Sequence, residues 1–311
     1  MKKIIVLGAG GLVGLNLLTA IDNSKYKIIA IDKKKENLEL AKRINPFIEI
    51  IAKDLSYPLK DIEDLFKNAF CVIQLQAQIS SVHKKDYINN NIKSIKNVTS
   101  ICEKYGVNNL IHLSSSVIMS VSKDDYSITK TIGENIIKNS KCNYTILRPP
   151  LMYGCFDIKH LDFIIKYLDN KIIFPIPGSG KYIRQPLYVM DLVSIILKLI
   201  EKKTENKIYN IIGKEKLYFI NLLRIIRMEK RKKTLFVKIP LPIFMIIFNV
   251  YNVLKNKKTY VRSQLTSLTA GDIFPASDWE KEFNLDYTPF KEGVKEMLNS
   301  KYYDYTKFMK K

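Results

Sequence analysis

The sequence predicts an α/β fold built on a doubly wound parallel sheet, with a smaller and mostly C-terminal α/β region attached to it. In the first half of the chain, short apolar runs alternate with segments of helical apolar spacing, as in a parallel sheet covered on both faces. The first run leads directly into a glycine-rich turn and a helix. After Arg148-Pro149-Pro150 the alternation breaks into shorter pieces punctuated by proline and glycine, which indicates a second region.

The alternating half contains six predicted strands, and this number implies a doubly wound sheet. The strands are expected at residues 3–7, 27–31, 47–51, 71–75, 109–113 and 144–147. The segments between them have the apolar spacing of helices, at residues 12–21, 35–43, 59–66, 89–105 and 128–139.

The two predicted regions interleave along the chain. Residues 1–150 form the sheet domain, and elements at about 183–212 are expected to return to it. Within that stretch, residues 183–187 and 208–212 resemble strands and 189–201 a helix. Residues 151–182 and 213–311 form the second region, in which the Pro/Gly-rich segment 174–180 is expected to be a loop beside a site.

Composition favours a folded protein of a reducing compartment. With 311 residues, 47% of them hydrophobic, the chain is long enough to fill both cores. Its four cysteines are widely spaced and form no CxxC or Cys/His cluster, so neither a disulfide framework nor a metal site is expected. The apolar run after the first two lysines is too short for a secretory signal, which favours the cytoplasm.

The formal net charge of +21 raises the question of an anionic partner. Most of the charge comes from lysine in a chain also rich in Ile and Asn, so a plain solvated basic surface accounts for much of it. Arginine is scarce, and no stretch interleaves aromatic with basic residues, so no nucleic-acid partner is expected. Anionic lipid and an anionic substrate stay compatible with this charge.

Residues 235–254 form the most apolar stretch of the chain. Lys238, Pro240, Pro242 and Asn249 interrupt it, which leaves too short a run to span about 30 Å of hydrocarbon. Two interpretations stay open for the helix expected at 243–254. It packs inside the second region, or it rests on the inner face of the cell membrane, because basic clusters at 227–233 and 255–258 flank it.

Gly8, Gly11 and Gly14 follow the first strand with the spacing GxxGxxG. The first allows a tight turn, the middle one lets backbone approach a pyrophosphate, and the last lets the helix pack closely on the strand. Asp32 closes the second strand, where a carboxylate binds the ribose hydroxyls of NAD and repels the 2′-phosphate of NADP. This context predicts a Rossmann site for NAD, although the lysines at 33–35 weaken the discrimination against NADP.

A tyrosine, a lysine and a run of serines are the candidate catalytic groups. Tyr126 and Lys130 lie four positions apart, which places phenol and ammonium on one face at a helix start. Ser115 belongs to a serine run directly after an apolar strand, at the edge where open α/β proteins bind ligands. Strand-end serines often only cap helices, and a Tyr/Lys pair is common by chance. The three groups and the glycine turn together, in this order, favour a catalytic site.

These features resemble the extended short-chain dehydrogenase/reductase family, in its sugar epimerase/dehydratase group, and the resemblance covers nearly the whole chain. Five further segments match family motifs, the VIHLAA strand, the NVxGTxNL helix and the RDxxxVxDL segment among them. They are Asp54-Leu55, Val72-Ile73-Gln74-Leu75-Gln76-Ala77, Asn91-Ile92-Lys93-Ser94-Ile95-Lys96-Asn97-Val98, Leu147-Arg148-Pro149-Pro150-Leu151-Met152-Tyr153-Gly154 and Arg184-Gln185-Pro186-Leu187-Tyr188-Val189-Met190-Asp191-Leu192.

The resemblance implies a role for each matching residue. Tyr126 is the acid/base, Lys130 holds the nicotinamide ribose and lowers the pKa of the tyrosine, and Ser115 binds the reacting oxygen. Ser115 is preferred because it lies three residues before the position of Val in the family's VYG tripeptide. Ser116 and Arg184 are expected to contact the substrate, the arginine at its phosphate. The residues expected to contact NAD are Gly8, Gly11, Leu12, Gly14, Asp32, Asp54, Leu55, Leu75, Gln76, Ala77, Asn91 and Lys130.

The resemblance thus implies an NAD-dependent epimerase, expected to act at C4 of a nucleotide- or polyprenyl-diphosphate-linked sugar and to form a homodimer. Three departures qualify it. Tyr126 follows Ser115 without the longer loop that often carries dehydratase acids, Gln76 takes a position beside the cofactor that a small residue usually fills, and the corner at residues 268–272 lacks the family's arginine. The alternatives are an NAD(P)-dependent reductase or dehydrogenase of the same fold, and a non-catalytic NAD-binding subunit.

Overall fold

A seven-stranded parallel sheet forms the core of one half of the protein, whose computed structural model describes residues 1–121, 123–158, 161–202, 206–254 and 271–303. The strand order is β11-β6-β5-β4-β1-β2-β3, and every neighbouring pair is parallel. The bounds are β1 Lys2–Leu7, β2 Tyr26–Asp32, β3 Glu49–Ala52, β4 Cys71–Gln74, β5 Leu110–Leu113, β6 Tyr144–Leu147 and β11 Lys207–Tyr209.

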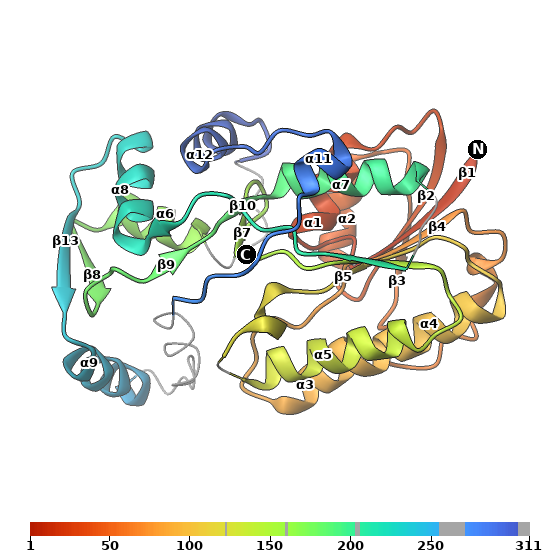
Figure 1. Cartoon of the computed structure of the whole chain (residues 1–311), viewed down its shortest axis with the longest axis horizontal. Coiled ribbons are helices and arrows are strands. Elements are labelled where there is room, and N and C mark those ends of the chain that lie inside the picture. Colours follow the sequence, from red (N-terminus) through yellow and green to blue (C-terminus); the bar gives the residue numbers. More distant parts are fainter. Residues whose placement is uncertain (122, 159–160, 203–205, 255–270, 304–311) are drawn as a thin grey trace.

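Helices cover both faces of this sheet (Figure 1). One face carries α1, α2 and α7, and the other carries α3, α4 and α5. The bounds are α1 Leu12–Ala20, α2 Lys35–Ile44, the 3-10 turn η1 Glu63–Phe66, α3 Lys84–Ile88, the π-helical segment η2 Asn89–Lys93, α4 Ser94–Lys104, the 3-10 turn η3 Ser116–Met119, α5 Asp125–Lys138 and α7 Val189–Glu201.

Alternate side chains of each strand enter two separate cores. In β4, Ile73 packs in the core beneath α1 and α7, while its neighbour Val72 packs in the core beneath α4 and α5. Both side chains are completely buried. Because both faces of the sheet are covered, its strands are continuously apolar instead of alternating with polar residues.

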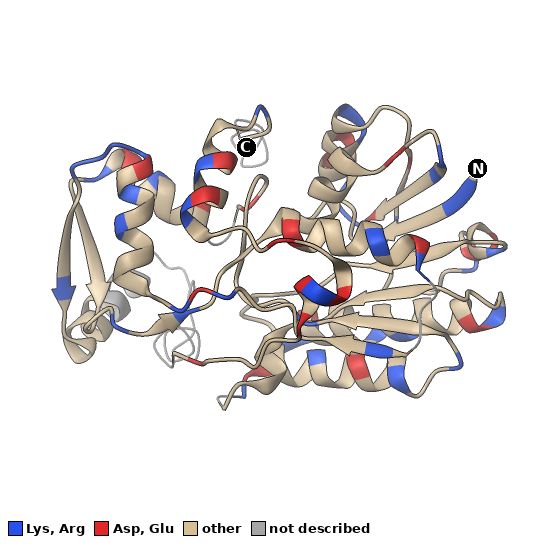
Figure 2. Cartoon of the chain, turned by 45° about the horizontal axis from the view of Figure 1, so that its top comes forward, with Lys and Arg blue, Asp and Glu red and all other residues tan. Residues whose placement is uncertain are grey.

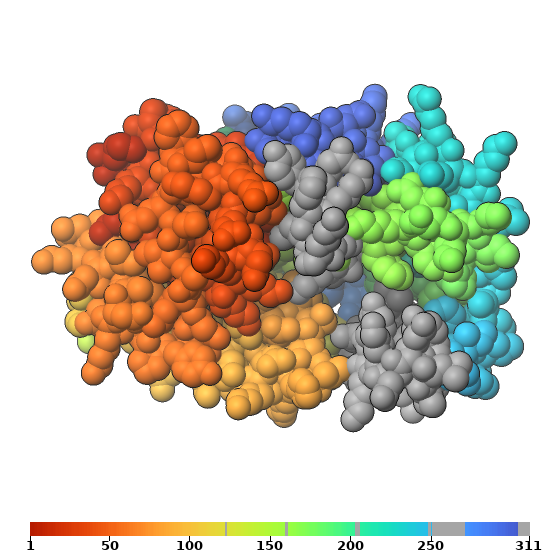
Figure 3. Space-filling model, turned by 180° about the vertical axis from the view of Figure 1, so that it is seen from behind, coloured from red at the N-terminus to blue at the C-terminus, as the bar shows by residue number. Residues whose placement is uncertain are grey.

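The remaining elements lie mainly at the other end of the molecule (Figures 1 and 3). Three small two-stranded sheets join β10 to β7 and β13 to β8 in parallel, and β12 to β9 antiparallel. The bounds are β7 Met152–Tyr153, α6 Leu161–Asn170, β8 Ile173–Pro177, β9 Ile183–Arg184, β10 Leu187–Tyr188, β12 Leu217–Tyr218, α8 Phe219–Glu229, β13 Leu235–Ile239, α9 Leu241–Leu254, α11 Trp279–Phe283 and α12 Phe290–Asn299.

The doubly wound parallel sheet predicted from the sequence is confirmed, with six predicted strands in place. Helix α7 covers the main sheet, and strand β11 pairs with β6 in it. One element of the second region returns too, because the indole of Trp279 in α11 donates to the carbonyl of Ile212 at 3.2 Å. The division into regions at residue 150 stays a prediction.

Three local predictions are wrong. Residues 59–66 form successive turns with i→i+3 bonds and only a short 3-10 helix, so no α-helix is present there. Residues 183–187 do not join the main sheet, because Pro186 separates β9 from β10 and each strand pairs elsewhere. The expected loop at 174–180 begins as strand β8, which pairs with β13.

Gly14→Ala tests the tight contact between α1 and the turn after β1. A Cβ atom at Gly14 would lie 2.5 Å from the carbonyl oxygen of Ala9, whereas one at Gly11 would meet nothing closer than 3.3 Å. We expect Gly14→Ala to lower the free energy of unfolding by about 2–4 kcal/mol. Gly11→Ala, as the matched control, should change it by less than about 1 kcal/mol. Urea denaturation measures both, and equal effects would contradict the packing argument.

Candidate active site

The turn between β1 and α1 is shaped for a phosphate group. Gly8 has a φ of +74°, and a Cβ atom there would lie 2.6 Å from the backbone nitrogen of Gln76. The N-cap residue of α1 is Gly11, which has no side chain to bond the first N–H groups of the helix. The first turn of the helix also contains no acidic residue. The helix therefore presents its N-terminal N–H groups and the positive end of its dipole without a neutralising side chain, which suits a pyrophosphate.

Asp32 lies beside this turn at the end of β2. Its carboxylate accepts hydrogen bonds from the backbone N–H of Gly10 at 3.1 Å and of Lys34 at 3.0 Å. Gly10, which sequence reasoning did not single out, is tightly enclosed, because a Cβ atom there would lie 2.4 Å from the Cβ of Asn37. The ammonium of Lys33 donates to the side-chain oxygen of Asn90 in η2 at 2.9 Å, so one of the lysines next to Asp32 already has a hydrogen-bond partner.

Gln76 provides a second sign that the crevice fits a polar ligand. Neither polar atom of its side-chain amide has a hydrogen-bond partner among the described residues, although both are buried. Buried amides that lack partners are costly, and a bound cofactor would supply them. The backbone of Gln76 adjoins Gly8 directly. Leu75 and Ala77 flank Gln76 at the end of β4, where the sequence places them.

Asp54 and Leu55 follow β3 but are occupied by local contacts. The Asp54 carboxylate accepts from the backbone N–H and the hydroxyl of Ser56, at 2.9 and 2.7 Å. The Leu55 side chain is buried in the core beneath α4 and α5, and its carbonyl accepts from Asn97 at 3.0 Å. Their contact with NAD stays a prediction.

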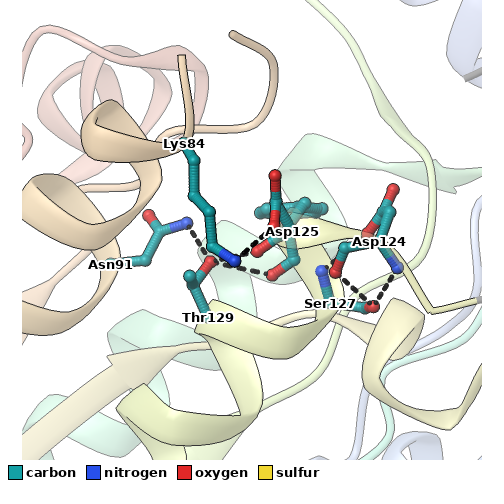
Figure 4. Close-up of polar contacts among 7 residues, drawn as sticks. Lys84, Asn91, Asp124, Asp125, Ser127 and Thr129 are labelled. Carbon is teal, nitrogen blue, oxygen red and sulfur yellow. Dashed lines mark hydrogen bonds and ion pairs between the residues drawn. The ribbon is translucent and has the colours of Figure 1, made fainter. Parts of the chain in front are cut away.

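The start of α5 is fixed by a reciprocal capping box (Figure 4). The Asp124 carboxylate accepts from the backbone N–H of Ser127 at 2.8 Å, while the Ser127 hydroxyl accepts from the backbone N–H of Asp124 at 2.9 Å. Lys84 in α3 forms an ion pair with Asp125 at 3.5 Å. These contacts define the position of the helical turn that carries Tyr126.

Asn91 supports the same turn from the opposite helix. Its side-chain amide donates to the hydroxyl of Thr129 at 3.1 Å and to the carbonyl of Gln78 at 3.0 Å, and its oxygen accepts from the N–H of Gln78. A Cβ atom at Gly133 would lie 2.7 Å from the carbonyl oxygen of Asn91, so α5 approaches Asn91 closely at this glycine. The amide of Asn91 therefore joins α5, η2 and the loop after β4, and its contact with NAD stays a prediction.

Ser115, Tyr126 and Lys130 meet at the carboxyl end of β5. Burial raises the pKa of Tyr126 to about 12, and a hydrogen bond with the Ser115 side chain partly opposes this rise. Lys130 is buried, and its ammonium donates to the carbonyl of Leu113 at 2.6 Å. Burial lowers the pKa of Lys130 to about 8, and Glu134 counteracts this effect. The protein's own groups thus keep the phenol protonated at neutral pH, and the lowering of its pKa expected from Lys130 together with bound NAD stays a prediction.

A buried ion pair next to Lys130 was not foreseen. Arg148, directly after β6, makes a bidentate contact with Glu134 at 2.8 and 2.6 Å. Although burial acts to raise the pKa of Glu134, hydrogen bonds led by that of Arg148 lower it overall. The pair joins α5 to the end of β6. The family-like Leu147-Arg148 segment and the position of Glu134 four residues after Lys130 were the available signals.

The structure also connects this site to Arg184 of the second region. The Ser120 hydroxyl donates to Asp272 at 2.5 Å, and Asp272 lies close enough to Arg184 to act on its pKa. Burial lowers the pKa of Arg184, and Tyr182 and Asp272 oppose that effect. Asp272 was not predicted to be a site residue. It places a carboxylate beside Arg184 at the corner where the family arginine is missing.

Ser115 and Ser116 differ in their surroundings. Ser115 contacts Tyr126, while the side chain of Ser116 is completely buried and its hydroxyl has no hydrogen-bond partner among the described residues. The Ser115 side chain accepts from the backbone N–H of Val117 at 3.4 Å, and its role as the reacting hydroxyl stays a prediction. Contact of Ser116 with substrate stays a prediction. Among the described residues, no group of three His, Cys, Asp or Glu side chains is arranged to hold a metal.

The model of the NAD-dependent epimerase/dehydratase family matches residues 4–211. The chain belongs to this family. A curated relative is the Escherichia coli O157:H7 N-acetyl-alpha-D-glucosaminyl-diphospho-ditrans,octacis-undecaprenol 4-epimerase, 23% identical over 84% of this chain and 83% of the relative. The Bacillus subtilis (strain 168) spore coat polysaccharide biosynthesis protein SpsK is 23% identical over 64% of this chain and 70% of its own.

Solved structures of sugar epimerases share the fold. A UDP-glucose 4-epimerase of Thermotoga maritima, with UDP-glucose, has a TM-score of 0.76 and 19% identity, covering 98% of this chain and 99% of its own. The UDP-glucuronic acid 4-epimerase of Bacillus cereus, with NAD, has a TM-score of 0.70 and 21% identity, covering 98% of this chain and 96% of its own. The sequence-based assignment to the epimerase/dehydratase group is thereby confirmed.

Asp32→Ala should remove discrimination between NAD and NADP. We expect the wild-type protein to bind NAD more tightly, because the Asp32 carboxylate repels a 2′-phosphate beside the turn at Gly10. Loss of one charge-assisted contact of about 1.5–3 kcal/mol corresponds to a weakening of NAD binding by about ten-fold or more. Isothermal calorimetry with both cofactors measures this. Tighter binding of NADP by the wild type would show that the neighbouring lysines outweigh Asp32.

Lys130→Met should raise stability at neutral pH while abolishing turnover. The pKa of Lys130 falls from 10.5 to about 8 on folding, so the unfolded chain binds more protons between these values. Wild-type stability therefore rises as pH increases through that window. We expect the variant to gain on the order of 1–2 kcal/mol at pH 7, because loss of the Leu113 contact offsets part of the relieved burial cost.

Thermal melts of both proteins from pH 7 to pH 10.5 measure this gain, which should shrink steadily above about pH 8. Lys85→Met, at an exposed position on α3, is the control and should change stability little at any pH. A Lys130→Met variant that is less stable than the wild type across the whole range would contradict the burial cost.

Proposed function

We propose that this protein is an NAD-dependent epimerase that inverts a carbon, with C4 as the preferred assignment, of a diphosphate-linked sugar. The observation that carries the proposal is the buried contact of Lys130 in α5 with the carbonyl of Leu113, at the end of the strand that leads into Ser115 and next to a glycine turn that fits a dinucleotide. Family membership and three named 4-epimerases among the similar proteins support it. The carrier of the sugar is a nucleotide or a polyprenyl chain.

Ser115, Tyr126 and Lys130 have separate roles in the proposed reaction. Ser115 donates to the reacting oxygen of the sugar, and Tyr126 removes the proton from that oxygen and later returns it. Bound NAD supplies the hydride acceptor, and its positive charge also favours the phenolate. Lys130 holds the ribose beside Tyr126. The substrate is oxidised to a ketosugar, which rotates in the site and is reduced on its other face. The cycle therefore consumes no cofactor.

Arg184 is the proposed phosphate contact. It lies in β9 and is coupled through Asp272 to Ser120, which follows the serine-containing turn η3. A substrate that reaches from Tyr126 to Arg184 would place its sugar at the first and its diphosphate at the second. Because Asp272 offsets part of the positive charge of Arg184, this clamp holds a diphosphate less strongly than two arginines would.

We propose that the protein forms a homodimer through α5. Ile128 and Ile132 lie one turn apart on this helix, and both are at least 40% exposed. Such a pair on the face of α5 that points away from the sheet suits a helix–helix contact between two copies. The helix also carries Tyr126, so an interface there would hold the active site in place.

Tyr126→Phe should abolish turnover and leave NAD binding nearly unchanged. Only the ionisable oxygen is lost, while the ring still packs beside Ser115. We expect activity below about one per cent of wild type, since general acid/base groups contribute about 10²–10⁴-fold. Because the phenolate is the active base, wild-type kcat should rise with pH as the phenol with NAD bound loses its proton.

Turnover is measured with nucleotide- and polyprenyl-diphosphate sugars, with NAD absorbance followed in parallel. An epimerase interconverts the two sugars without net formation of NADH. Stoichiometric NADH would favour the dehydrogenase alternative, and Tyr126→Phe activity close to wild type would mean that another residue is the base. If the wild type binds NAD and no sugar of the panel reacts, the non-catalytic alternative gains.

A further inference from the structure

Helix α9 presents an apolar face that the rest of the described chain does not cover. Ile243, Ile246, Ile247 and Val250 recur with the spacing of one helix face, and each is at least 50% exposed. No described side chain of α9 is buried. A surface helix of a monomeric protein normally turns such a stripe towards the core, and exposed stripes mark interaction sites. This arrangement disfavours the interpretation that α9 packs inside the second region.

The apolar surface continues onto the ribbon formed by β8 and β13. Ile173 and Leu235 are partners across the ribbon, and both are more than half exposed. Val237, two residues further along β13, is exposed as well and lies on the same side. Figure 1 shows that the ribbon and α9 together form the end of the molecule opposite to the N-terminus.

Basic side chains surround this apolar end. Lys171 precedes β8, Arg231 and Lys233 precede β13, and Lys238 lies within it, and all four are exposed. None of them forms an ion pair with a carboxylate in the described part of the chain. Figure 2 shows the basic residues of the β13 ribbon and of the loop that leads into it. An apolar face with a cationic rim is complementary to a bilayer with anionic head groups.

We propose that α9 and the β8–β13 ribbon dock this protein on the surface of a lipid bilayer that contains anionic lipids. The 14 residues of α9 span about 21 Å, less than the hydrocarbon thickness of about 30 Å, so the helix lies in the interface. No helix in the described ranges is long and apolar enough to cross a membrane. The isoleucines enter the acyl boundary while the lysines remain among the head groups.

The charge pattern favours a bilayer over a second copy of the chain as the occupant. A two-fold contact through α9 would bring the same basic rim against itself, because such an interface pairs one patch with its own copy. Like charges then oppose each other across the contact. Anionic head groups instead neutralise the rim.

Docking would favour a polyprenyl-linked substrate, and this consequence rests on the proposed function, whereas docking itself does not. Arg184 lies in β9, in the same half of the molecule as the ribbon (Figure 1). A protein attached through this half would hold its phosphate contact on the side of the molecule that faces the membrane.

Flotation of the full chain with vesicles tests the proposal. The vesicles are pure phosphatidylcholine, and phosphatidylcholine mixed with phosphatidylglycerol, at low and moderate salt. We expect binding to the anionic vesicles that weakens with salt, and about ten-fold less binding to the neutral ones. Ile246→Glu combined with Ile247→Glu should lower binding by more than about ten-fold, because two carboxylates replace apolar side chains at the contact. Lys233→Glu with Lys238→Glu should reduce binding to anionic vesicles only.

Phe47→Glu is the matched control, because Phe47 is 80% exposed in the sheet domain, and this variant should float like the wild type. Melting temperature confirms that each variant is folded. Equal flotation of the Ile246/Ile247 double variant and the wild type, or no flotation of the wild type, overturns the proposal. So does a double variant that changes from dimer to monomer in sedimentation while its flotation is unchanged. Activity on a soluble nucleotide sugar is scored separately, so its absence counts against the proposed function and not against docking.

Discussion

The contact between Lys130 and the carbonyl of Leu113 is the interaction on which the site depends. It fastens α5, which carries Tyr126, to the end of β5, which leads into Ser115. Burial of the ammonium costs desolvation free energy, and the negative charge of Glu134 offsets only part of that cost. Proteins retain such costly groups mostly at functional sites, where stability is given up for chemistry.

The surrounding contacts hold this helix in a single position. A capping box fixes its first turn, Asn91 joins it to the loop after β4, and Arg148 joins it to the end of β6 through Glu134. The phenol is therefore positioned by three separate parts of the sheet domain. Protein groups leave it protonated, so the positive charge of a bound cofactor is the natural means of making it a base.

The second half of the molecule contributes different chemistry to the same protein. Asp272 brings Ser120 and Arg184 into one electrostatic group, so a turn of the sheet domain and a strand of the smaller sheets share one corner. At the far end, α9 and the β8–β13 ribbon expose an apolar surface with a basic rim. The reacting centre and this surface are built from separate segments, so each can be altered without the other.

Local sequence determined the sheet and most of the candidate site. Apolar runs of four to seven residues had to be buried strands, and Gly8 and Gly14 had to be glycine because backbone lies within 3 Å of where a Cβ atom would be. The order of Ser115, Tyr126 and Lys130 along the chain was enough to bring them to one sheet edge.

Only the tertiary structure decided contacts between segments far apart in the chain, such as Asp272 with Ser120 and Arg148 with Glu134. A single sequence carries no signal of which distant polar groups share a buried environment. The exposure of α9 was likewise undecided, since an apolar helix has the same sequence whether a core or a bilayer covers it. The failed strand at 183–187 has the same origin, because its partner depends on which neighbouring backbone is free to pair.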